Sequence, residues 1–102
     1  DIELVPGHSM IPFRGSLENP LVKAVVQNVE DVYGMPPAIH PNMAGSNGMG
    51  FLCGLTGTPA VCYGVFNDDS HCHAPNEYIF LEDFFNGIKL SAAVFHDFAE
   101  VE

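Results

Sequence analysis

Hydrophobic residues recur at helical spacing in two parts of the chain. In residues 19–33 the valines stand three or four positions apart, and in residues 82–100 a stripe of mostly Phe and Ala does the same. Asn19 can cap the first segment, Pro20 suits its first helical position, and Gly34 ends it. We therefore predict two amphipathic helices. Because valine is a poor helix former, the first one needs an apolar surface to pack against.

Between these helices the pattern changes to short apolar runs. Residues 60–65 are nearly continuously apolar, which is typical of a strand buried on both faces of a parallel sheet, and residues 38–40 are a second, shorter strand candidate. A third helix is predicted to start at Ser46 or Asn47 and to run to Leu55, although three glycines weaken it. This alternation predicts the α/β class: an incomplete fragment of an open αβα sandwich with a few short strands and three helices. Such a small sheet would leave edges and apolar faces uncovered.

Composition and charge exclude several classes of function. The chain has 102 residues and is 47% hydrophobic, which fits one globular domain. Its net charge of -10 would repel nucleic acid and anionic lipid, and no apolar run is long enough to span a bilayer. Three cysteines without a C-x-x-C pair suit a reducing compartment, so we expect a cytoplasmic protein. The first residues lack a signal-peptide pattern and resemble a cut end.

Candidate chemistry is concentrated in the polar segment 67–76. Imidazole, thiolate and carboxylate donors, the ligand types of zinc, stand close together there, at Asp68, Asp69, His71, Cys72 and His73. Their spacing does not bring them together without a tight loop. On local sequence alone, a solvated polar loop after a buried strand is therefore the favoured interpretation.

Three motifs together resemble a known family. They are the H-A-P-N-E-Y-I string at 73–79 with the L-E-D-F-F-N-G-I helix start after it, the Ala44-Gly45-Ser46-Asn47 turn, and the helix pattern from Asn19 followed by Tyr33-Gly34 and a proline. Over about residues 10–98 the chain resembles the C-terminal part of the catalytic domain of the zinc aminoacylase, carboxypeptidase and desuccinylase family, also called the peptidase dimerisation-domain metallopeptidases.

The resemblance implies a parent hydrolase with two zinc ions that cleaves amide bonds of peptides or N-acyl amino acids. His73 would ligate one zinc, and Asn76 and Glu77 would orient it, although a loop histidine and a simple helix entry are the alternatives. Gly45, Ser46 and Asn47 would bind a substrate carboxylate, unless they only cap a helix. No residue of this chain is assigned a catalytic role, because the family's other zinc ligands and its general base have no match here.

The resemblance also suggests how the chain is divided. Residues 1–12 would be a linker or the end of the lid or dimerisation domain, and residues 13–102 the C-terminal segment of the catalytic domain. The expected partners are the remainder of the parent chain and a second copy, with no nucleic acid and no membrane. The alternative function is a non-catalytic module that associates with itself through its apolar surface.

Overall fold

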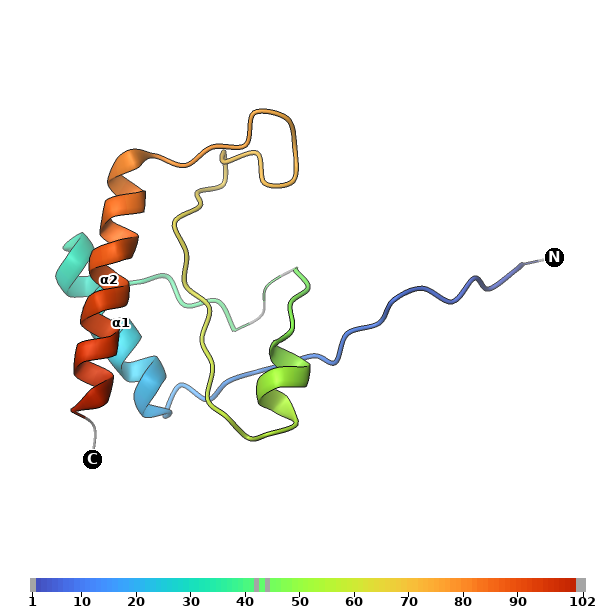
Figure 1. The fold of residues 1–102 in the computed structure, drawn as a ribbon, viewed down its shortest axis with the longest axis horizontal. Coiled ribbons are helices and arrows are strands. Elements are labelled where there is room, and N and C mark those ends of the chain that lie inside the picture. The colour runs from blue at the N-terminus through green and yellow to red at the C-terminus, as the bar shows by residue number, and fades with distance from the viewer. Residues whose placement is uncertain (1, 42, 44, 101–102) are drawn as a thin grey trace.

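The protein is described by a computed structural model that covers residues 2–41, 43 and 45–100. These residues form two α-helices and one short π-helix joined by long extended segments, as Figure 1 shows. The helices are α1 (Pro20–Tyr33), η1 (Gly50–Gly54) and α2 (Leu81–Ala99). Within the described ranges no residue is in a β-strand.

Helix α1 begins and ends where its sequence predicts. The Asn19 backbone is extended, and its side-chain Oδ1 accepts a hydrogen bond from the Leu21 N–H at 2.9 Å. Pro20 occupies the first turn, where its missing N–H leaves no helical bond unmade. Gly34 adopts a left-handed conformation, with φ 71°, and its N–H donates to the Glu30 carbonyl at 2.8 Å. The predicted helix is confirmed.

Helix α2 also confirms its prediction, to within one residue at each end. It spans Leu81–Ala99, where the sequence pattern predicted 82–100. Phe80 precedes it without making a side-chain cap. Glu82 and Asp83 lie in the first turn, where their negative charge interacts favourably with the helix dipole.

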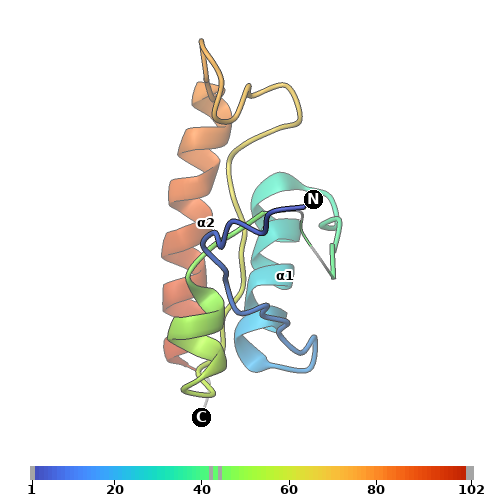
Figure 2. The same cartoon turned by 90° about the vertical axis from the view of Figure 1, so that its right-hand side faces the viewer.

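The core lies between α1 and α2, which run side by side in both ribbon views (Figures 1 and 2). Val25 of α1 packs with Leu90 and Val94 of α2, and all three side chains are buried. Further apolar residues border this cluster, among them Val29, Val32 and Val61. The apolar partner that the valine-rich helix requires is therefore α2.

One polar contact crosses between the two helices. Asn28 is 4% exposed, and its Nδ2 donates to the Ala24 carbonyl at 2.9 Å and to Asp97 Oδ2 at 2.8 Å. His96 Nδ1 lies 3.1 Å from the other carboxylate oxygen. The Asn28 amide, and then His96, hold the pKa of Asp97 below its ordinary value.

The two predicted strands are wrong for the described residues. Residues 60–65 are extended beside α2, with Val61 at the core and Val65 so close to Gly87 that a Cβ on that glycine would overlap it. Neither 60–65 nor 38–40 makes a backbone hydrogen bond to another described main-chain group. A strand exists only as part of a ladder, and the described chain supplies no neighbour for either segment. The α/β class is therefore not seen in these residues.

The third predicted helix is reduced to η1, a single turn of five residues. It starts at Gly50, beyond Ser46 and Asn47. The N-terminal segment passes directly over it, because a Cβ on Gly50 would overlap the Ile11 carbonyl oxygen. Glycine permits this close approach but weakens a helix by about 1 kcal/mol relative to alanine, so the glycines keep this helix short.

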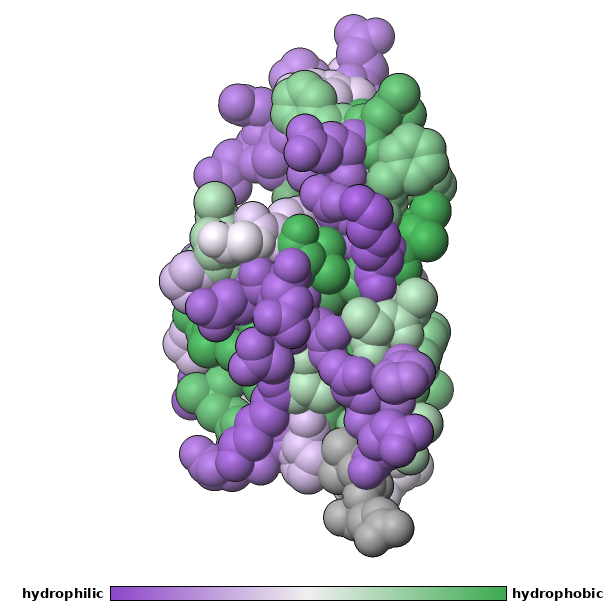
Figure 3. Space-filling model, turned by 90° about the vertical axis from the view of Figure 1, so that its left-hand side faces the viewer, coloured by the Kyte–Doolittle hydropathy of each residue, from purple (hydrophilic) through white to green (hydrophobic). Residues whose placement is uncertain are grey.

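Much apolar surface stays uncovered. Large apolar side chains along α2 are exposed, and the space-filling view in Figure 3 shows apolar residues reaching the surface among polar ones. The exposed residues of α2 include Leu81, Phe84, Phe85, Ile88 and Phe95. No described helix has the length and hydropathy needed to cross a bilayer.

We predict that Leu90→Ala lowers the free energy of unfolding by about 2–5 kcal/mol, because it leaves a cavity between the helices. Leu90 is 2% exposed. Leu81→Ala is the matched control, since Leu81 is 74% exposed and its truncation removes little buried surface. Denaturant unfolding followed by circular dichroism measures both, and equal losses in the two variants would contradict the assigned core.

We also predict a pH-dependent contribution from Asp97. Because its pKa is lowered in the folded state, the contact stabilises the fold above the ordinary carboxyl pKa of about 4 and is lost as the pH falls through the lowered value. The difference in unfolding free energy between wild type and Asp97→Asn should therefore shrink as the solution is acidified. When Asn28 is replaced by alanine in both proteins, the difference in unfolding free energy between Asp97 and Asp97→Asn should depend less on pH. Equal pH dependence in both backgrounds would show that Asn28 is not the cause.

Candidate functional site

The segment that carries His73 is a tight loop built on Ser70. The Ser70 side chain is fully buried, and its Oγ accepts from the Asn67 N–H at 3.0 Å. The same hydroxyl lies 3.2 Å from Asn67 Oδ1, to which it donates. Asn67 Oδ1 also accepts from the Asp69 N–H at 3.0 Å. These short-range bonds form a compact turn directly before the histidines.

The far end of the loop returns to the same residue. The Tyr78 N–H donates to the Ser70 carbonyl at 3.1 Å, so residues 71–77 leave from and return to one point. Within the loop the Ala74 N–H donates to the His71 carbonyl at 2.8 Å. The His71 ring meets Tyr78 edge to face at 5.8 Å between centroids, and Tyr78 meets Phe80 in the same way at 5.5 Å. The aromatic contacts connect the loop to the start of α2.

Three residues of the loop have left-handed backbones. They are His71, His73 and Asn76, with φ of 53°, 63° and 62°. Each such residue other than glycine costs about 1–2 kcal/mol, although asparagine tolerates the conformation best. The surrounding hydrogen bonds must offset this cost. His73 itself is exposed.

Asn76 and Glu77 were predicted to orient His73. Asn76 lies at a left-handed position of the loop, and the carboxylate of Glu77 lies beside the Cys72 thiol. Partial desolvation by the surrounding loop, and then the charge of Glu77 and its hydrogen bond, raise the pKa of the Cys72 thiol. An orienting role for either residue stays a prediction.

The predicted substrate turn lies elsewhere in the molecule. Gly45, Ser46 and Asn47 are exposed ahead of η1, and Ala44 of the same motif lies outside the described residues. Asn47 Oδ1 accepts from the Met49 N–H at 2.9 Å, which makes a local Asn turn directly before η1, while the N-cap of η1 itself makes no side-chain capping hydrogen bond. The Asn47 amide also lies 3.8 Å from Cys62 Sγ, and the Cys62 thiol donates to Met49 Sδ at 3.3 Å.

The described residues do not bring the two predicted site segments together. In both ribbon views the 71–77 loop is at the opposite end of the molecule from η1 (Figures 1 and 2). Nowhere in 2–41, 43 and 45–100 do three His, Cys, Asp or Glu side chains gather as a metal site. The loop therefore offers two exposed imidazoles, His71 and His73, which are too few donors for a catalytic zinc site on their own.

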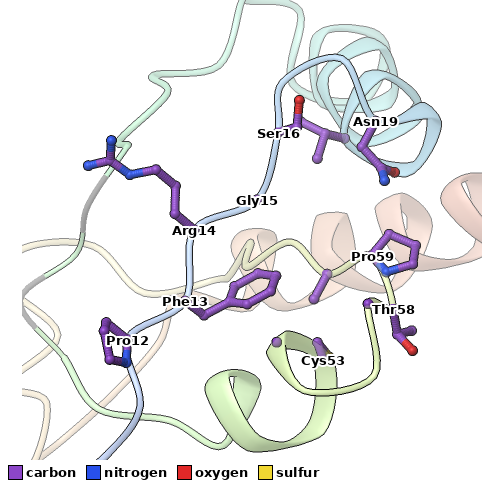
Figure 4. A pocket seen from close by; sticks show the side chains of 13 residues that line it. Pro12, Phe13, Arg14, Gly15, Ser16, Asn19, Cys53, Thr58 and Pro59 are labelled. Atoms are coloured by element: carbon purple, nitrogen blue, oxygen red, sulfur yellow. The ribbon is translucent and has the colours of Figure 1, made fainter.

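A cleft of about 370 Å³ opens between the entry to α1 and the end of η1, and Figure 4 shows it from close by. It contains none of the predicted site residues. Its polar groups serve local structure: Asn19 caps α1, and Ser16 Oγ accepts from the Glu18 N–H at 3.2 Å. Figure 4 shows the Arg14 side chain directed away from Cys53 and Pro59. The cleft therefore results from the way these segments pack, and its lining residues do not form a candidate chemical site as the 71–77 loop does.

Asn67 and Ser70, on which the loop is built, are not predicted as site residues from the sequence. The sequence does contain a signal, because Asn67 and Ser70 bound a run of Asn, Asp and Ser residues, and these residues favour turns. It predicts a turn but cannot predict that Ser70 becomes buried. Burial depends on how the loop folds back over it.

Comparison with known proteins places this loop in a family. The model of peptidase family M20/M25/M40 matches residues 1–97. A solved structure, an M20 family metallo-carboxypeptidase, Sso-CP2, from Sulfolobus solfataricus, is 33% identical with a TM-score of 0.74. The match covers 81% of this chain and 20% of that one, so this chain spans about a fifth of the solved relative. No curated protein matches this chain.

The family match includes both the His73 loop and the Gly45–Asn47 turn, and it confirms the resemblance inferred from the three sequence motifs. The chain belongs to the M20/M25/M40 peptidase family.

Proposed function

We propose that the chain is part of a zinc-dependent hydrolase that cleaves amide bonds in peptides or N-acyl amino acids, with His73 as one zinc ligand. Family membership supports this proposal, and so does the name of the similar solved protein, a metallo-carboxypeptidase. The observation that carries it is the 71–77 loop, which holds an exposed imidazole on a backbone with little freedom.

An imidazole nitrogen is a good zinc donor, but one donor does not make a site. A catalytic zinc usually has three protein ligands and one open position for water. The remaining ligands, and both zinc ions of the enzyme, therefore depend on the rest of the full-length protein. When bound, zinc polarises the amide carbonyl and lowers the pKa of its water. The 102-residue chain alone is expected to be inactive.

The Gly45–Asn47 turn is proposed as part of the substrate pocket. The Asn47 oxygen is already bonded to the Met49 N–H, so a substrate carboxylate would be bound by main-chain N–H groups and the Ser46 hydroxyl. Asn76 and Glu77 are proposed to support the His73 loop. Carboxypeptidase substrates and N-acyl amino acids both carry a carboxylate next to the scissile amide, which is the group that such a turn would bind.

The remainder of the protein is the proposed partner of the extended segment 60–65. The main-chain groups of residues 60–65 make no backbone hydrogen bond to described residues, and Val61 and Val65 pack this segment against the helices. A neighbouring strand from elsewhere in the full-length chain would satisfy these groups and build the αβα sandwich. In this proposal residues 1–12 are a linker or the end of the lid or dimerisation domain, and residues 13–102 close the catalytic domain.

A second candidate is a non-catalytic module that associates with itself. The exposed apolar residues on α2 and the unpaired segment 60–65 favour it, because both features drive association when nothing covers them. A homo-oligomer is therefore proposed for the isolated chain whichever function holds. The mass of the natural protein distinguishes the two proposed functions, because a natural product of 102 residues would contradict the hydrolase proposal.

We predict that His73→Ala in the full-length protein removes about one of two zinc ions per subunit and most amidase activity, because a lost ligand opens the coordination shell. Metal content by elemental analysis and hydrolysis of an N-acyl amino acid are the measurements. His40→Ala is the matched control, since His40 is exposed and no metal role is proposed for it. Unchanged zinc content in His73→Ala would end the assignment.

For the isolated chain we predict self-association that weakens at low ionic strength. Burying a few hundred Å² of apolar surface contributes several kcal/mol at about 25 cal/mol per Å², whereas the net charge of -10 opposes it most when screening is poor. Phe95→Asp should weaken the dimer, since Phe95 is 75% exposed on α2.

Sedimentation across a salt series measures this association. Met10→Asp adds the same charge on the N-terminal segment and should have the smaller effect. A compact monomer at every salt concentration would contradict the prediction.

A further inference from the structure

The histidine loop depends on one buried hydroxyl. Ser70 is 0% exposed, although every residue from 71 to 77 is exposed. A small polar side chain that is completely removed from water costs stability unless its hydrogen bonds are made. Ser70 is nevertheless buried at the base of an exposed loop, so the hydrogen bonds that it makes must stabilise this part of the chain.

The Ser70 hydroxyl has both kinds of partner. It accepts from the Asn67 N–H at 3.0 Å and donates to Asn67 Oδ1 at 3.2 Å. Asn67 Oδ1 accepts a second hydrogen bond, from the Asp69 N–H at 3.0 Å. The Ser70 N–H donates to the Asn67 carbonyl at 3.1 Å, so side chains and backbone fix the same turn.

Through its carbonyl, Ser70 also determines where the loop ends. The Tyr78 N–H donates to it at 3.1 Å, and between these two residues His71, His73 and Asn76 have positive φ. Such backbones persist only where the surroundings over-determine them. If the turn at Ser70 loosens, the left-handed residues can relax, and the His73 ring changes its direction.

We infer that Ser70, together with Asn67, is a positioning residue that holds His73 in the geometry required for zinc. The inference rests on the proposed role of His73 as a ligand. Metal sites require ligand distances within about 0.2 Å of their ideal values. Loss of the groups that orient a ligand typically weakens metal binding by about 10–100-fold.

The test measures zinc affinity of the full-length protein by competition with a chromophoric chelator. Ser70→Ala and Asn67→Ala should each weaken one zinc site by about 10-fold or more, while the second site stays unchanged. Asn67→Asp should keep wild-type affinity, because both partners of Asn67 Oδ1 are donors that a carboxylate also accepts. Ser9→Ala, on the exposed N-terminal segment, is the serine control.

Two further measurements separate the possible outcomes. Thermal unfolding of the metal-free protein reports general destabilisation, which Asn67→Asp should not show because a carboxylate keeps both hydrogen bonds of Asn67 Oδ1. If Ser70→Ala does not fold, the Asn67→Ala and Asn67→Asp pair decides. His73→Ala is measured in parallel. If His73→Ala loses zinc but Asn67→Ala keeps the wild-type zinc affinity, the role of Ser70 and Asn67 is overturned and the role of His73 stands. Unchanged zinc in His73→Ala overturns the proposed function as well.

Discussion

The packing of α1 against α2 is the contact on which the rest of the structure depends. Val25, Leu90 and Val94 form the buried cluster, and the valine-rich α1 has too little intrinsic helix propensity to persist without it. The 60–65 segment then lies on the same two helices through Val61 and Val65. Because this segment leads into the histidine loop, the position of His73 follows from helix packing several residues away.

The extended segment connects fold to function in a second way. Its sequence has the composition of a buried strand, yet it makes no backbone hydrogen bond to the described residues. Strand formation requires a neighbouring chain segment at hydrogen-bonding distance, so it is a property of the assembled sheet. The same segment supports the proposed dependence of activity on the rest of the protein.

The histidine loop differs because its structure is made by near neighbours. Hydrogen bonds over two or three residues form its turns, among them those from the Asn67 N–H to Ser70 Oγ and from the Ala74 N–H to the His71 carbonyl. One longer bond, from Tyr78 to Ser70, closes it. The conformation of the loop is therefore set mainly by local bonds, whereas its position depends on the helices beside it, and a complete metal site still needs donors from elsewhere.

The sequence by itself determined what depends on local interactions. The Asn19 cap, Gly34 and the spacing of apolar residues predicted both long helices, and the H-A-P-N-E string predicted the family. Only the tertiary structure decided the rest: that residues 60–65 make no backbone hydrogen bond to the described residues, that the helix after Asn47 is a single turn under Ile11, and that Ser70 is buried. Caps and helical periodicity act over a few residues, whereas burial and strand pairing depend on segments that are distant in the chain.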